Sequence, residues 1–507
     1  MDAFLLLNPL LCFLTAASLS AWFVLKRRRT NQQQGVQPPS PPRLPILGNL
    51  HQISPLAHRS FHALGAKYGP IMLLHFGSRP MIIVQSSAGA AEILKTHDLV
   101  FGDRTVSRRT MKKLAYNQKD IALSPYGEHW RKLKSICVLQ MLSNKRVQSF
   151  HFIREEETSL LVEKIKACCN SPVNLSELFT LFTNDVACRA SCRKKYSEGE
   201  DGRRILRLLR EVSQLLGRFN IGDFIPWLGW IDRMTGFNRR VDRVAKEVDE
   251  FLEMVIQDHL NSRGLEIGES GHGNHEDSFV GILLNSYGDG NIDRDGIKAI
   301  ILDMIVGGTE TVAAALEWTM TELFKHPNVM DKLKCEVRAI LKDKDNTTSI
   351  TNNELEQMQY LRAVVKEIMR MHPPNPFTGR VARQDVKVMG YDIPAGAMAL
   401  VSAWAIGRDP ANWDEPDAFK PERFLGSSID FKGADFELIP FGAGRRGCPG
   451  IGFAMASIRF LLANLIYKFD WELPLRTKWE DLDATEQPGG VTARKNPLFA
   501  VPKVAQF

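Results

Sequence analysis

Cysteine is scarce in this chain, and its eight residues follow no regular interval. A disulfide framework needs densely and regularly spaced cysteines, so we expect none, and the pattern indicates a reducing compartment. No CxxC pair is present, which argues against the usual structural zinc sites. The cysteines are Cys12, Cys137, Cys168, Cys169, Cys188, Cys192, Cys335 and Cys448.

A large excess of charge is also lacking. The formal net charge is +7 over 507 residues. A positive charge this small does not indicate a nucleic-acid partner, and we expect none. It does suit contact with an acidic protein surface.

Long hydrophobic runs are rare, and the first one is uncharged over residues 3–25. A membrane-spanning helix needs about 20 such residues, and the basic residues 26–29 that follow favour the cytosolic side. A cleaved signal peptide is the alternative, but the run is too long and Asp2 precedes it where lysines are usual. We therefore predict a transmembrane anchor at 1–25, a basic and proline-rich linker at 26–45, and one large domain at 46–507.

Helical patterns dominate the rest of the chain. Segments 296–325, 352–371 and 451–469 are predicted to be helices, and Thr351 with Glu354 fits a capping box at the start of the second. Short strand-like runs occur near 70–85, at 386–394 and close to the C-terminus. The predicted fold class is mainly α with a small β region.

One cysteine lies in an unusually permissive loop, FGAGRRGCPG, at residues 441–450. Its glycines let a flat ligand approach the sulfur, while the two arginines and a helix beginning near Gly450 favour a thiolate. Such a sulfur is a nucleophile, a redox thiol or a metal ligand. The loop holds no general base for a nucleophile and no resolving cysteine for a redox thiol. Axial ligation of a haem iron by Cys448 requires neither.

This loop closely resembles the haem-binding signature of cytochromes P-450. We assign its fixed positions to Phe441, Gly444, Arg445, Cys448 and Gly450. The resemblance implies the cytochrome P-450 fold and haem b (iron protoporphyrin IX), with Cys448 as the axial ligand of the iron. The loop and residues 224–237 are similar to those of plant microsomal enzymes of the seventy-one clan.

Two further segments resemble the family's structural motifs. KEIMR contains Glu367 and Arg370, and PERF contains Arg423. An exposed pair spaced i, i+3 would contribute little to stability. The resemblance implies instead that the three side chains form a buried structural charge cluster behind the haem.

A third segment, GGTET at 307–311, lies within the predicted helix 296–325. Its two glycines weaken the helix and favour a local opening. The resemblance implies that Glu310 and Thr311 handle protons during oxygen activation. Gly307 and Val312 differ from the usual residues at their positions, and we expect them to alter the width of the groove.

The resemblance also implies cations for the haem propionates. Residues 129–134, HWRKLK, are similar to the family's Trp-Arg-x-x-Arg helix and supply Trp130, Arg131 and Lys134. Lysine there offers a point charge in place of a bidentate fork. Arg380 is a further candidate, although Gly379 replaces the proline that usually precedes it.

By the same resemblance, the substrate pocket is lined by several segments that are mostly apolar, which favours a hydrophobic small molecule. Ordinary core packing is the alternative for the methionine and isoleucine among them. The residues assigned to the pocket are Leu114, Met304, Ile305, Gly308, Phe377, Thr378 and Val491.

The implied enzyme is a monooxygenase that inserts one atom of O2 into a plant specialised metabolite such as a terpenoid, phenylpropanoid or alkaloid. Electrons come from NADPH through NADPH–cytochrome P-450 reductase, for which Lys132, Lys145 and Arg146 form the expected dock. The anchor implies contact with membrane lipid and a single-pass location in the endoplasmic reticulum membrane, with the catalytic domain in the cytosol.

Two other functions stay open from the sequence. One is a haem-thiolate dehydratase or isomerase that needs no reductase, acting for example on aldoximes or hydroperoxides. The other is a haem sensor or carrier without turnover. Reductase-dependent oxygen uptake separates the monooxygenase from both.

Overall fold

The computed structural model describes residues 35–104, 109–217, 220–266, 278–288, 290, 292–342, 344, 349–474 and 477–506. The predicted anchor and most of the linker, residues 1–34, lie outside the described residues. Within the described part, Arg294–Lys325 and Ile451–Lys468 are long and apolar enough to cross a membrane, but most of each is buried inside the protein.

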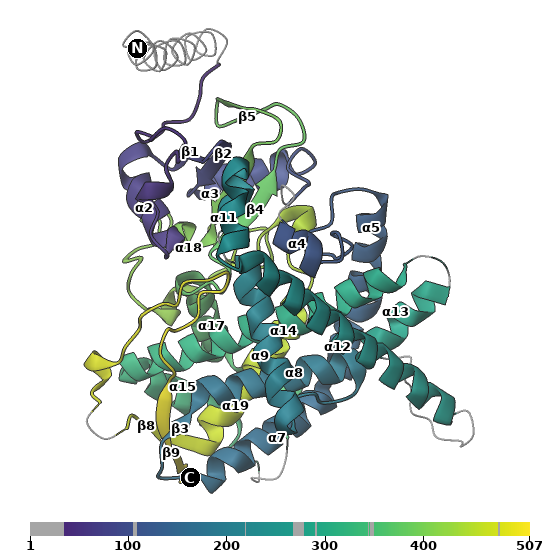
Figure 1. Cartoon of the computed structure of the whole chain (residues 1–507). Coiled ribbons are helices and arrows are strands. Elements are labelled where there is room, and N and C mark those ends of the chain that lie inside the picture. The colour runs from purple at the N-terminus through teal and green to yellow at the C-terminus, as the bar shows by residue number, and fades with distance from the viewer. Residues whose placement is uncertain are drawn as a thin grey trace, which may run out of the picture.

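Helices make up most of the molecule, as predicted, and form the lower body in Figure 1. The N-terminal half contains α2 (Ala57–Tyr68), α3 (Ser87–Ala91), α4 (Arg109–Leu114), α5 (Glu128–Ser135), α6 (Asn144–Ser149), α7 (His151–Ala167), α8 (Leu175–Cys192), α9 (Gly199–Gly217), α10 (Ile221–Phe224), α11 (Gly229–Met234) and α12 (Phe237–Glu266). The C-terminal half contains α13 (Phe279–Gly288), α14 (Arg294–Lys325), α15 (Pro327–Ile340), α16 (Asn352–Gln357), α17 (Gln359–Met371), α18 (Ala403–Ile406) and α19 (Ile451–Lys468).

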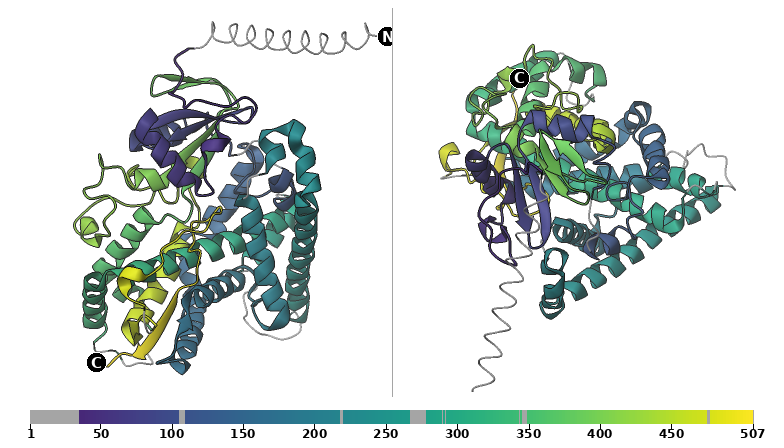
Figure 2. Two further views of the ribbon diagram at one scale, coloured as in Figure 1. Left: turned by 60° about the vertical axis from the view of Figure 1, so that its left-hand side comes forward. Right: turned by 90° about the horizontal axis from the view of Figure 1, so that it is seen from above.

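The β region is small and has three parts. A four-stranded sheet has the order β1 (Ile71–Phe76), β2 (Arg79–Val84), β7 (Met398–Ser402), β4 (Phe377–Val381), in which only β2 and β7 are parallel. A second sheet has the order β3 (Val173–Asn174), β9 (Phe499–Val504), β8 (Phe469–Glu472), and β5 (Val386–Val388) pairs with β6 (Tyr391–Ile393). Figure 2 shows the purple N-terminal strands beside green strands that are far away in the sequence.

The long helix α14 runs through the centre of the helical body. Asp293 caps its first turn by accepting a hydrogen bond from Gly296 N at 2.9 Å. The helix packs against α8, α13, α17 and α19, and the main hydrophobic core surrounds it. This packing fixes α14 as one wall of the space in front of the Cys448 loop.

The predicted helix 352–371 is two helices in the structure. The capping box predicted at Thr351 and Glu354 is present and starts α16. Met358 then leaves the helical region, with ψ 80°, and α17 begins at the next residue. Met358 is fully buried, so side-chain packing breaks a segment whose apolar spacing predicted one helix.

Candidate active site

A cavity of about 630 Å³ lies between α14 and the Cys448 loop. Its wall comes from α4 and the region after it, one face of α5, the C-terminal end of α9, the middle of α14, strands β4 and β7, and the Cys448 loop. Most of these wall residues are apolar. The few ionisable groups among them are therefore the candidates for binding and chemistry.

The Cys448 loop presents its sulfur to this cavity. Gly442 and Gly444 both have positive φ, 68° and 69°, and a Cβ on Gly444 would meet the Leu94 carbonyl oxygen at 2.1 Å. Cys448 N donates to Phe441 O at 3.0 Å, and Gly450 N donates to Cys448 Sγ at 3.3 Å. The glycines thus form a tight turn that exposes the sulfur to the cavity interior.

The local charges do not by themselves make Cys448 a thiolate. Burial raises the pKa of its thiol, although the Gly450 N–H, Arg104 and Lys134 act in the opposite direction. The sequence predicted a lowered pKa from the arginines and the helix terminus. Desolvation is the largest cause, so the pKa of the thiol in the protein alone is raised and not lowered.

The two arginines of the loop lie on opposite sides of it. Arg445 is about half exposed (49%) and pairs with Asp98 at 3.1 Å, away from the cavity. Arg446 is 2% exposed, lines the cavity and has its guanidinium 4.1 Å from the centroid of the Trp130 ring. The fixed arginine of the signature stands two residues before the cysteine, so the assignment to Arg445 was wrong by one position and Arg446 is the residue concerned.

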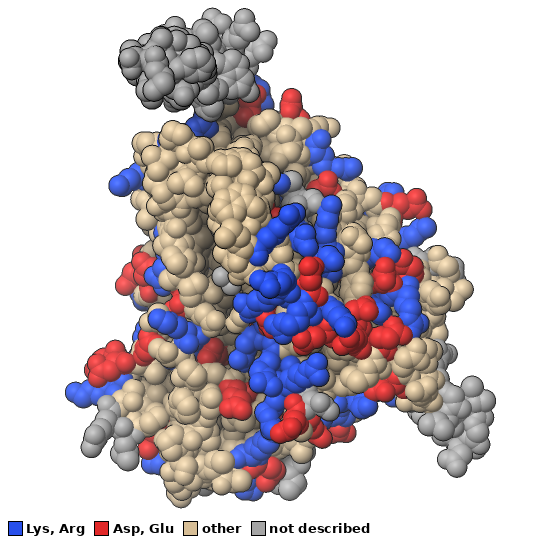
Figure 3. Space-filling view, in the orientation of Figure 1, with Lys and Arg blue, Asp and Glu red and all other residues tan. Residues whose placement is uncertain are grey.

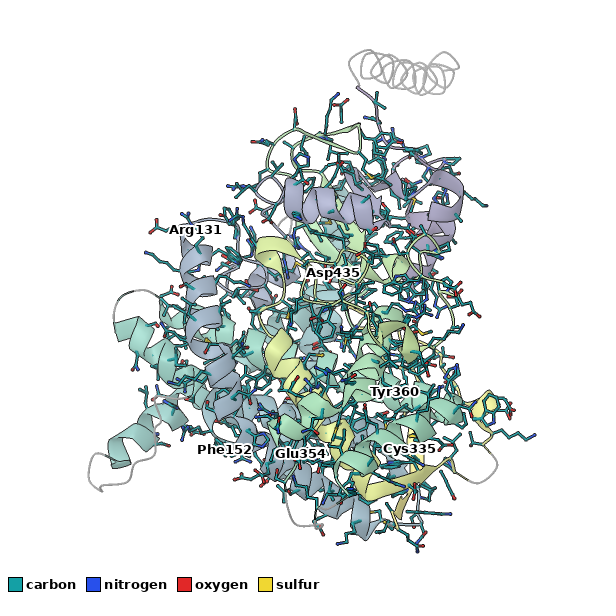
Figure 4. All side chains as sticks on the ribbon, turned by 180° about the vertical axis from the view of Figure 1, so that it is seen from behind. Arg131, Phe152, Cys335, Glu354, Tyr360 and Asp435 are labelled. Atoms are coloured by element: carbon teal, nitrogen blue, oxygen red, sulfur yellow. The ribbon has the colours of Figure 1, made fainter. Side chains whose placement is uncertain are left out.

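Of the three candidate residues on helix α5, two line the cavity and one faces away from it. Trp130 and Lys134 line the cavity; Trp130 Nε1 donates to Ile121 O at 3.1 Å, and Lys134 Nζ donates to Gly447 O at 3.1 Å. Arg131 is exposed on the outer side of α5, as Figure 4 shows. Successive helical residues differ by about 100° in direction, so Arg131 does not reach the site that its neighbour Trp130 faces.

A cluster of four cations, Arg104, Lys134, Arg380 and Arg446, lies at this end of the cavity. Burial is the first cause of a lowered pKa for all four, and their mutual repulsion adds to it for Lys134, Arg380 and Arg446. Arg104 donates to Arg446 O, and Arg380, 1% exposed, reaches Ala443 O at 3.4 Å. The sequence analysis missed Arg104, because nothing in its local pattern separates it from the other arginines of that segment.

The cation cluster fits a dianionic ligand. Arg104 Nε is buried and has no hydrogen-bond partner among the described residues. Like charges held together with lowered pKa values are stabilised by an anion placed between them. Haem carries two propionates and an iron atom, so the cations at one edge and Cys448 on the wall match its two kinds of polar group.

Glu310 and Thr311 face the cavity from α14. The helix is continuous through Gly307, so the predicted local opening is not a break. A Cβ on Gly307 would meet no atom within 4 Å, and the missing side chain itself leaves space. Thr311 Oγ1 donates to Gly307 O at 2.7 Å. Burial raises the pKa of Glu310 to about 7, with Ser213 on α9 opposing the shift.

Glu367, Arg370 and Arg423 meet in a buried cluster. Arg370 donates to both carboxylate oxygens of Glu367, each at 2.8 Å, and Arg423 Nε lies 3.2 Å from Glu367 Oε1. Lys420 N adds a bond to the same oxygen at 2.8 Å. Arg370 also donates to Ala418 O at 3.1 Å. The cluster thereby joins α17 to the segment around Pro421–Phe424.

Most of the residues assigned to the pocket line the cavity, and one does not. Ile305 is fully buried in the main core and is absent from the cavity wall. Its neighbour Met304 points to the cavity, since the two side chains are about 100° apart around α14. The assigned residues found on the wall are Leu114, Met304, Gly308, Phe377, Thr378 and Val491.

Asp303 is a second residue that sequence reasoning missed. It lines the cavity from α14 and its Oδ2 accepts hydrogen bonds from Ile121 N at 2.9 Å and Ala122 N at 3.2 Å. Burial raises its pKa to about 6, and the two N–H groups act against that shift. Asp303 thus holds the loop whose Ile121 carbonyl oxygen accepts the hydrogen bond from Trp130. Only the fold brings these segments together, 181 and 182 positions apart in sequence.

Replacing Asp303 by alanine should loosen this loop without removing the cofactor site. Each hydrogen bond to a charged group is worth roughly 1.5–3 kcal/mol, so we expect amide exchange at Ile121 and Ala122 to accelerate at least about tenfold. Hydrogen-exchange mass spectrometry of the loop peptide measures it. Asp331→Ala, which removes an exposed acid from α15, away from this loop, is the control. Equal protection in both variants would contradict the role given to Asp303.

The chain matches known proteins over almost its whole length. A family model described as Cytochrome P450 matches residues 38–500. Cytochrome P450 736A117 of Prunus mume is 50% identical over 491 residues, which cover 95% of this chain and 93% of that protein. Tabersonine/lochnericine 19-hydroxylase of Catharanthus roseus is 47% identical over 471 residues, 92% of each chain.

A solved structure shows a similar fold. A zebra fish cytochrome P450 with progesterone superposes with a TM-score of 0.74 at 23% sequence identity, covering 88% of this chain and 99% of that one. At 23% identity, the similarity is evidence for the fold alone. It agrees with the mainly helical architecture and its small β region.

Proposed function

The chain belongs to the cytochrome P450 family, and from this premise we propose that it is a haem-thiolate monooxygenase acting on an apolar plant specialised metabolite. Electrons are supplied by NADPH through a reductase. The observation that carries the proposal is a single cavity that joins Cys448, a cation cluster and the Glu310–Thr311 pair.

Three features of this chain would hold haem. Cys448 Sγ would ligate the iron from a turn that its glycines allow. Arg104, Lys134 and Arg446 line the cavity where they can neutralise two propionates, and Arg380 lies beside them. When bound, haem supplies the redox-active iron at which oxygen is activated.

Glu310 and Thr311 are placed to move protons. With a pKa of about 7, the Glu310 carboxyl both holds and releases a proton near neutral pH. The Thr311 hydroxyl is fixed on Gly307 O and lies on the cavity wall. Glu310 and Thr311 both line the cavity, so each can exchange a proton with a group bound there, while the apolar wall restricts water.

The substrate is proposed to be a hydrophobic terpenoid, phenylpropanoid or alkaloid. The cavity wall is largely apolar, with Leu114, Met304, Phe377 and Val491 among its members. Norfluorocurarine oxidase of Strychnos sp is 44% identical to this chain over 506 residues. With the 19-hydroxylase described above, it is a relative named for oxidation of compounds of this kind.

The reductase is proposed to dock beside the Cys448 loop. Helix α6 packs against α19, the helix that follows Cys448. Lys145 is exposed on α6, and Lys132 is exposed on the neighbouring α5, where it pairs with Glu128 at 3.1 Å. Together with the half-buried Arg146, they are proposed to form the basic surface that the reductase contacts. The location is proposed to be the endoplasmic reticulum membrane, through the N-terminal anchor.

Oxygen uptake by the full-length protein tests the proposal. Microsomes that contain it and a plant reductase are expected to consume O2 and NADPH when a substrate is added. The two alternatives give other results. A dehydratase or isomerase would form product without reductase, and a haem sensor or carrier would bind haem without turnover. Either outcome would overturn the monooxygenase.

Replacing Thr311 by alanine should uncouple electron use from product formation. Haem and substrate binding are expected to stay, while product formed per NADPH falls by about 10²-fold, the low end for loss of a positioned proton donor. Hydrogen peroxide should account for the missing electrons. Quantifying product, NADPH and peroxide in one reaction measures all three.

Thr309→Ala is the matched control for this variant. Thr309 is two residues away on α14, but it is buried outside the cavity and donates to Ile305 O at 2.6 Å. It should stay coupled. Full coupling in Thr311→Ala would refute the proton role of Thr311.

A further inference from the structure

Glu486 is a buried carboxylate of which one oxygen is paired and the other is not. It is 3% exposed, and its Oε2 lies 2.9 Å from His58 Nε2 and 2.6 Å from Arg59 Nε, both on α2. Burial acts to raise the pKa of Glu486, but these two partners hold it at about 2, so the group is ionised. Its Oε1 is buried and has no hydrogen-bond partner among the described residues. Figure 3 shows largely uncharged surface over α2 and the strand-rich region, and a carboxylate in such surroundings is costly unless both oxygens are hydrogen-bonded.

His372, which follows α17, has a second unpaired acceptor. Its Nε2 lies 2.9 Å from Glu322 Oε1. Burial lowers the pKa of His372, although the bond to Glu322 opposes that shift, so the ring is neutral near pH 7. Burial acts to raise the pKa of Glu322, but the bond from His372 keeps it below its ordinary value. Nε2 therefore carries the proton that Glu322 accepts, and Nδ1 is an acceptor, buried and without a partner in the part of the chain that the structure describes.

Two unpaired donors lie in the same region. Trp404 on α18 is 5% exposed and Thr492 is 3% exposed. The Trp404 Nε1–H and the Thr492 hydroxyl are both buried, and neither finds a hydrogen-bond partner within the described residues. The Trp404 ring lies 5.1 Å from the ring of His58, the residue that binds Glu486. This donor is therefore close to the unpaired carboxylate oxygen.

The remaining contacts bring these groups together. Trp318 stacks on His372, with ring centroids 4.1 Å apart, and its Nε1 donates to Thr492 O at 2.7 Å. A β-bridge between Glu486 and Arg494 folds the segment 484–494 back on itself. The charge of Glu486 also acts on the pKa of His372. Four segments that are distant in sequence thus meet around one buried polar position.

The unpaired groups at this position are chemically complementary. Two acceptors cannot bond to each other, and neither can two donors. A water molecule donates two hydrogen bonds and accepts two, so it satisfies one pair of each kind at once. The acceptors are Glu486 Oε1 and His372 Nδ1, and the donors are Trp404 Nε1 and Thr492 Oγ1.

We propose that these four atoms bind one internal water molecule, and that this water clamps the segment 484–494 to α2, α18 and the end of α17. Gly490 and Val491 of the segment line the main cavity. The water therefore positions part of the cavity wall without touching a ligand there. The alternative is four independent packing defects that share no solvent. The clamp does not depend on the proposed chemistry, because it is a property of the protein before any turnover.

Backbone amide exchange in the segment 484–494 of the full-length haem protein tests the clamp. Thr492→Val keeps the shape of the side chain but removes its hydroxyl, and we expect exchange to accelerate about tenfold. Trp404→Phe removes a donor on another segment and should have a similar effect. Since both variants weaken the binding of one water, the double variant should stay well below the roughly hundredfold acceleration of independent sites. Hydrogen-exchange mass spectrometry measures all three.

Two controls separate loss of the water from loss of packing. Thr492→Ser keeps the hydroxyl and should keep slow exchange. Trp413→Phe removes another buried indole donor, whose Nε1 bonds to Ile406 O at 3.2 Å, and should leave the segment unchanged. Fast exchange in Thr492→Ser, an additive double variant, or equal exchange in Trp404→Phe and Trp413→Phe would each overturn the shared water.

Binding of 4-phenylimidazole tests the effect on the cavity wall. The nitrogen of this apolar ligand binds haem iron and shifts its absorption band, which gives Kd by titration. Trp404 and Thr492 do not belong to the cavity wall, yet Kd should rise in Trp404→Phe and Thr492→Val and stay unchanged in Thr492→Ser. Faster exchange with an unchanged Kd would refute the positioning role. A carbon monoxide spectrum recorded first shows whether each variant holds thiolate-ligated haem, so failure of the clamp and failure of the monooxygenase are distinguishable.

Discussion

Replacing Cys448 by alanine is expected to abolish monooxygenase activity and the red-shifted carbon monoxide band of thiolate-ligated haem. Among the described residues, Cys448 is the only cysteine on the cavity wall, so no second sulfur can take its place. The reduced, carbon monoxide-treated difference spectrum of the membrane-expressed protein measures the loss. Haem still held by the cation cluster would give a spectrum without the thiolate band.

Cys335→Ala is the control for this substitution. Cys335 is exposed on α15, on the outer face visible in Figure 4, and it has no part in the cavity. Its removal should leave the spectrum and activity unchanged. A normal thiolate band in Cys448→Ala protein would contradict the central assignment, and the oxygenase proposal would fall with it.

The sequence could predict the Cys448 loop because its chemistry is local. Glycines that tolerate positive φ, a cysteine and a following helix lie within ten residues, so the local sequence indicates the turn. The pKa of the Cys448 thiol was not predictable, because burial and the distant Arg104 and Lys134 contribute to it. The end of helix α14 and the start of helix α19 were predictable for a similar reason, since Pro327 follows the first and the glycine loop precedes the second. The break at Met358 was not, because burial of that side chain overrides a regular apolar pattern.

Direction around a helix or turn was the main source of wrong assignments. Arg445, Arg131 and Ile305 each lie one position from a residue that does face the cavity. A motif gives the right neighbourhood, but one residue is about 100° of rotation on a helix, enough to move a side chain from the cavity to solvent or core. Such positions need the register of the element to be known, which packing decides.

Arg104 and Asp303 escaped sequence reasoning for a different reason. Neither stands in a pattern that marks it locally. Arg104 is a candidate for binding an anion because three other cations lie beside it. Asp303 holds a loop because two backbone N–H groups that are distant in sequence donate to it. Buried polar groups of this kind are detectable only when their partners, or the lack of them, are seen in three dimensions.

Replacing Glu367 by glutamine is expected to cost the folded protein roughly 3–5 kcal/mol, the usual penalty for removing one partner of a buried ion pair. Glu367 is fully buried and pairs with Arg370, also fully buried, and with Arg423. Glutamine keeps the size but removes the negative charge, which leaves two guanidinium groups without their counterion. The free energy of unfolding in urea, followed together by tryptophan fluorescence and by the thiolate-ligated carbon monoxide band, measures the effect.

Glu356→Gln is the control. It removes an exposed carboxylate that pairs with Arg362 of the same helix α17, so it shows what the loss of a carboxylate costs when the group is not buried. Glu356 is 60% exposed and pairs with Arg362 of α17 at 3.1 Å and with Arg459 at 2.9 Å. Water screens such a pair, so its loss should cost at most about 1 kcal/mol. If the two variants were equally stable, the cluster at Glu367 would not be the structural element argued for. If Glu367→Gln alone lost activity while its unfolding free energy stayed unchanged, the cluster would belong to the chemistry and not to the architecture.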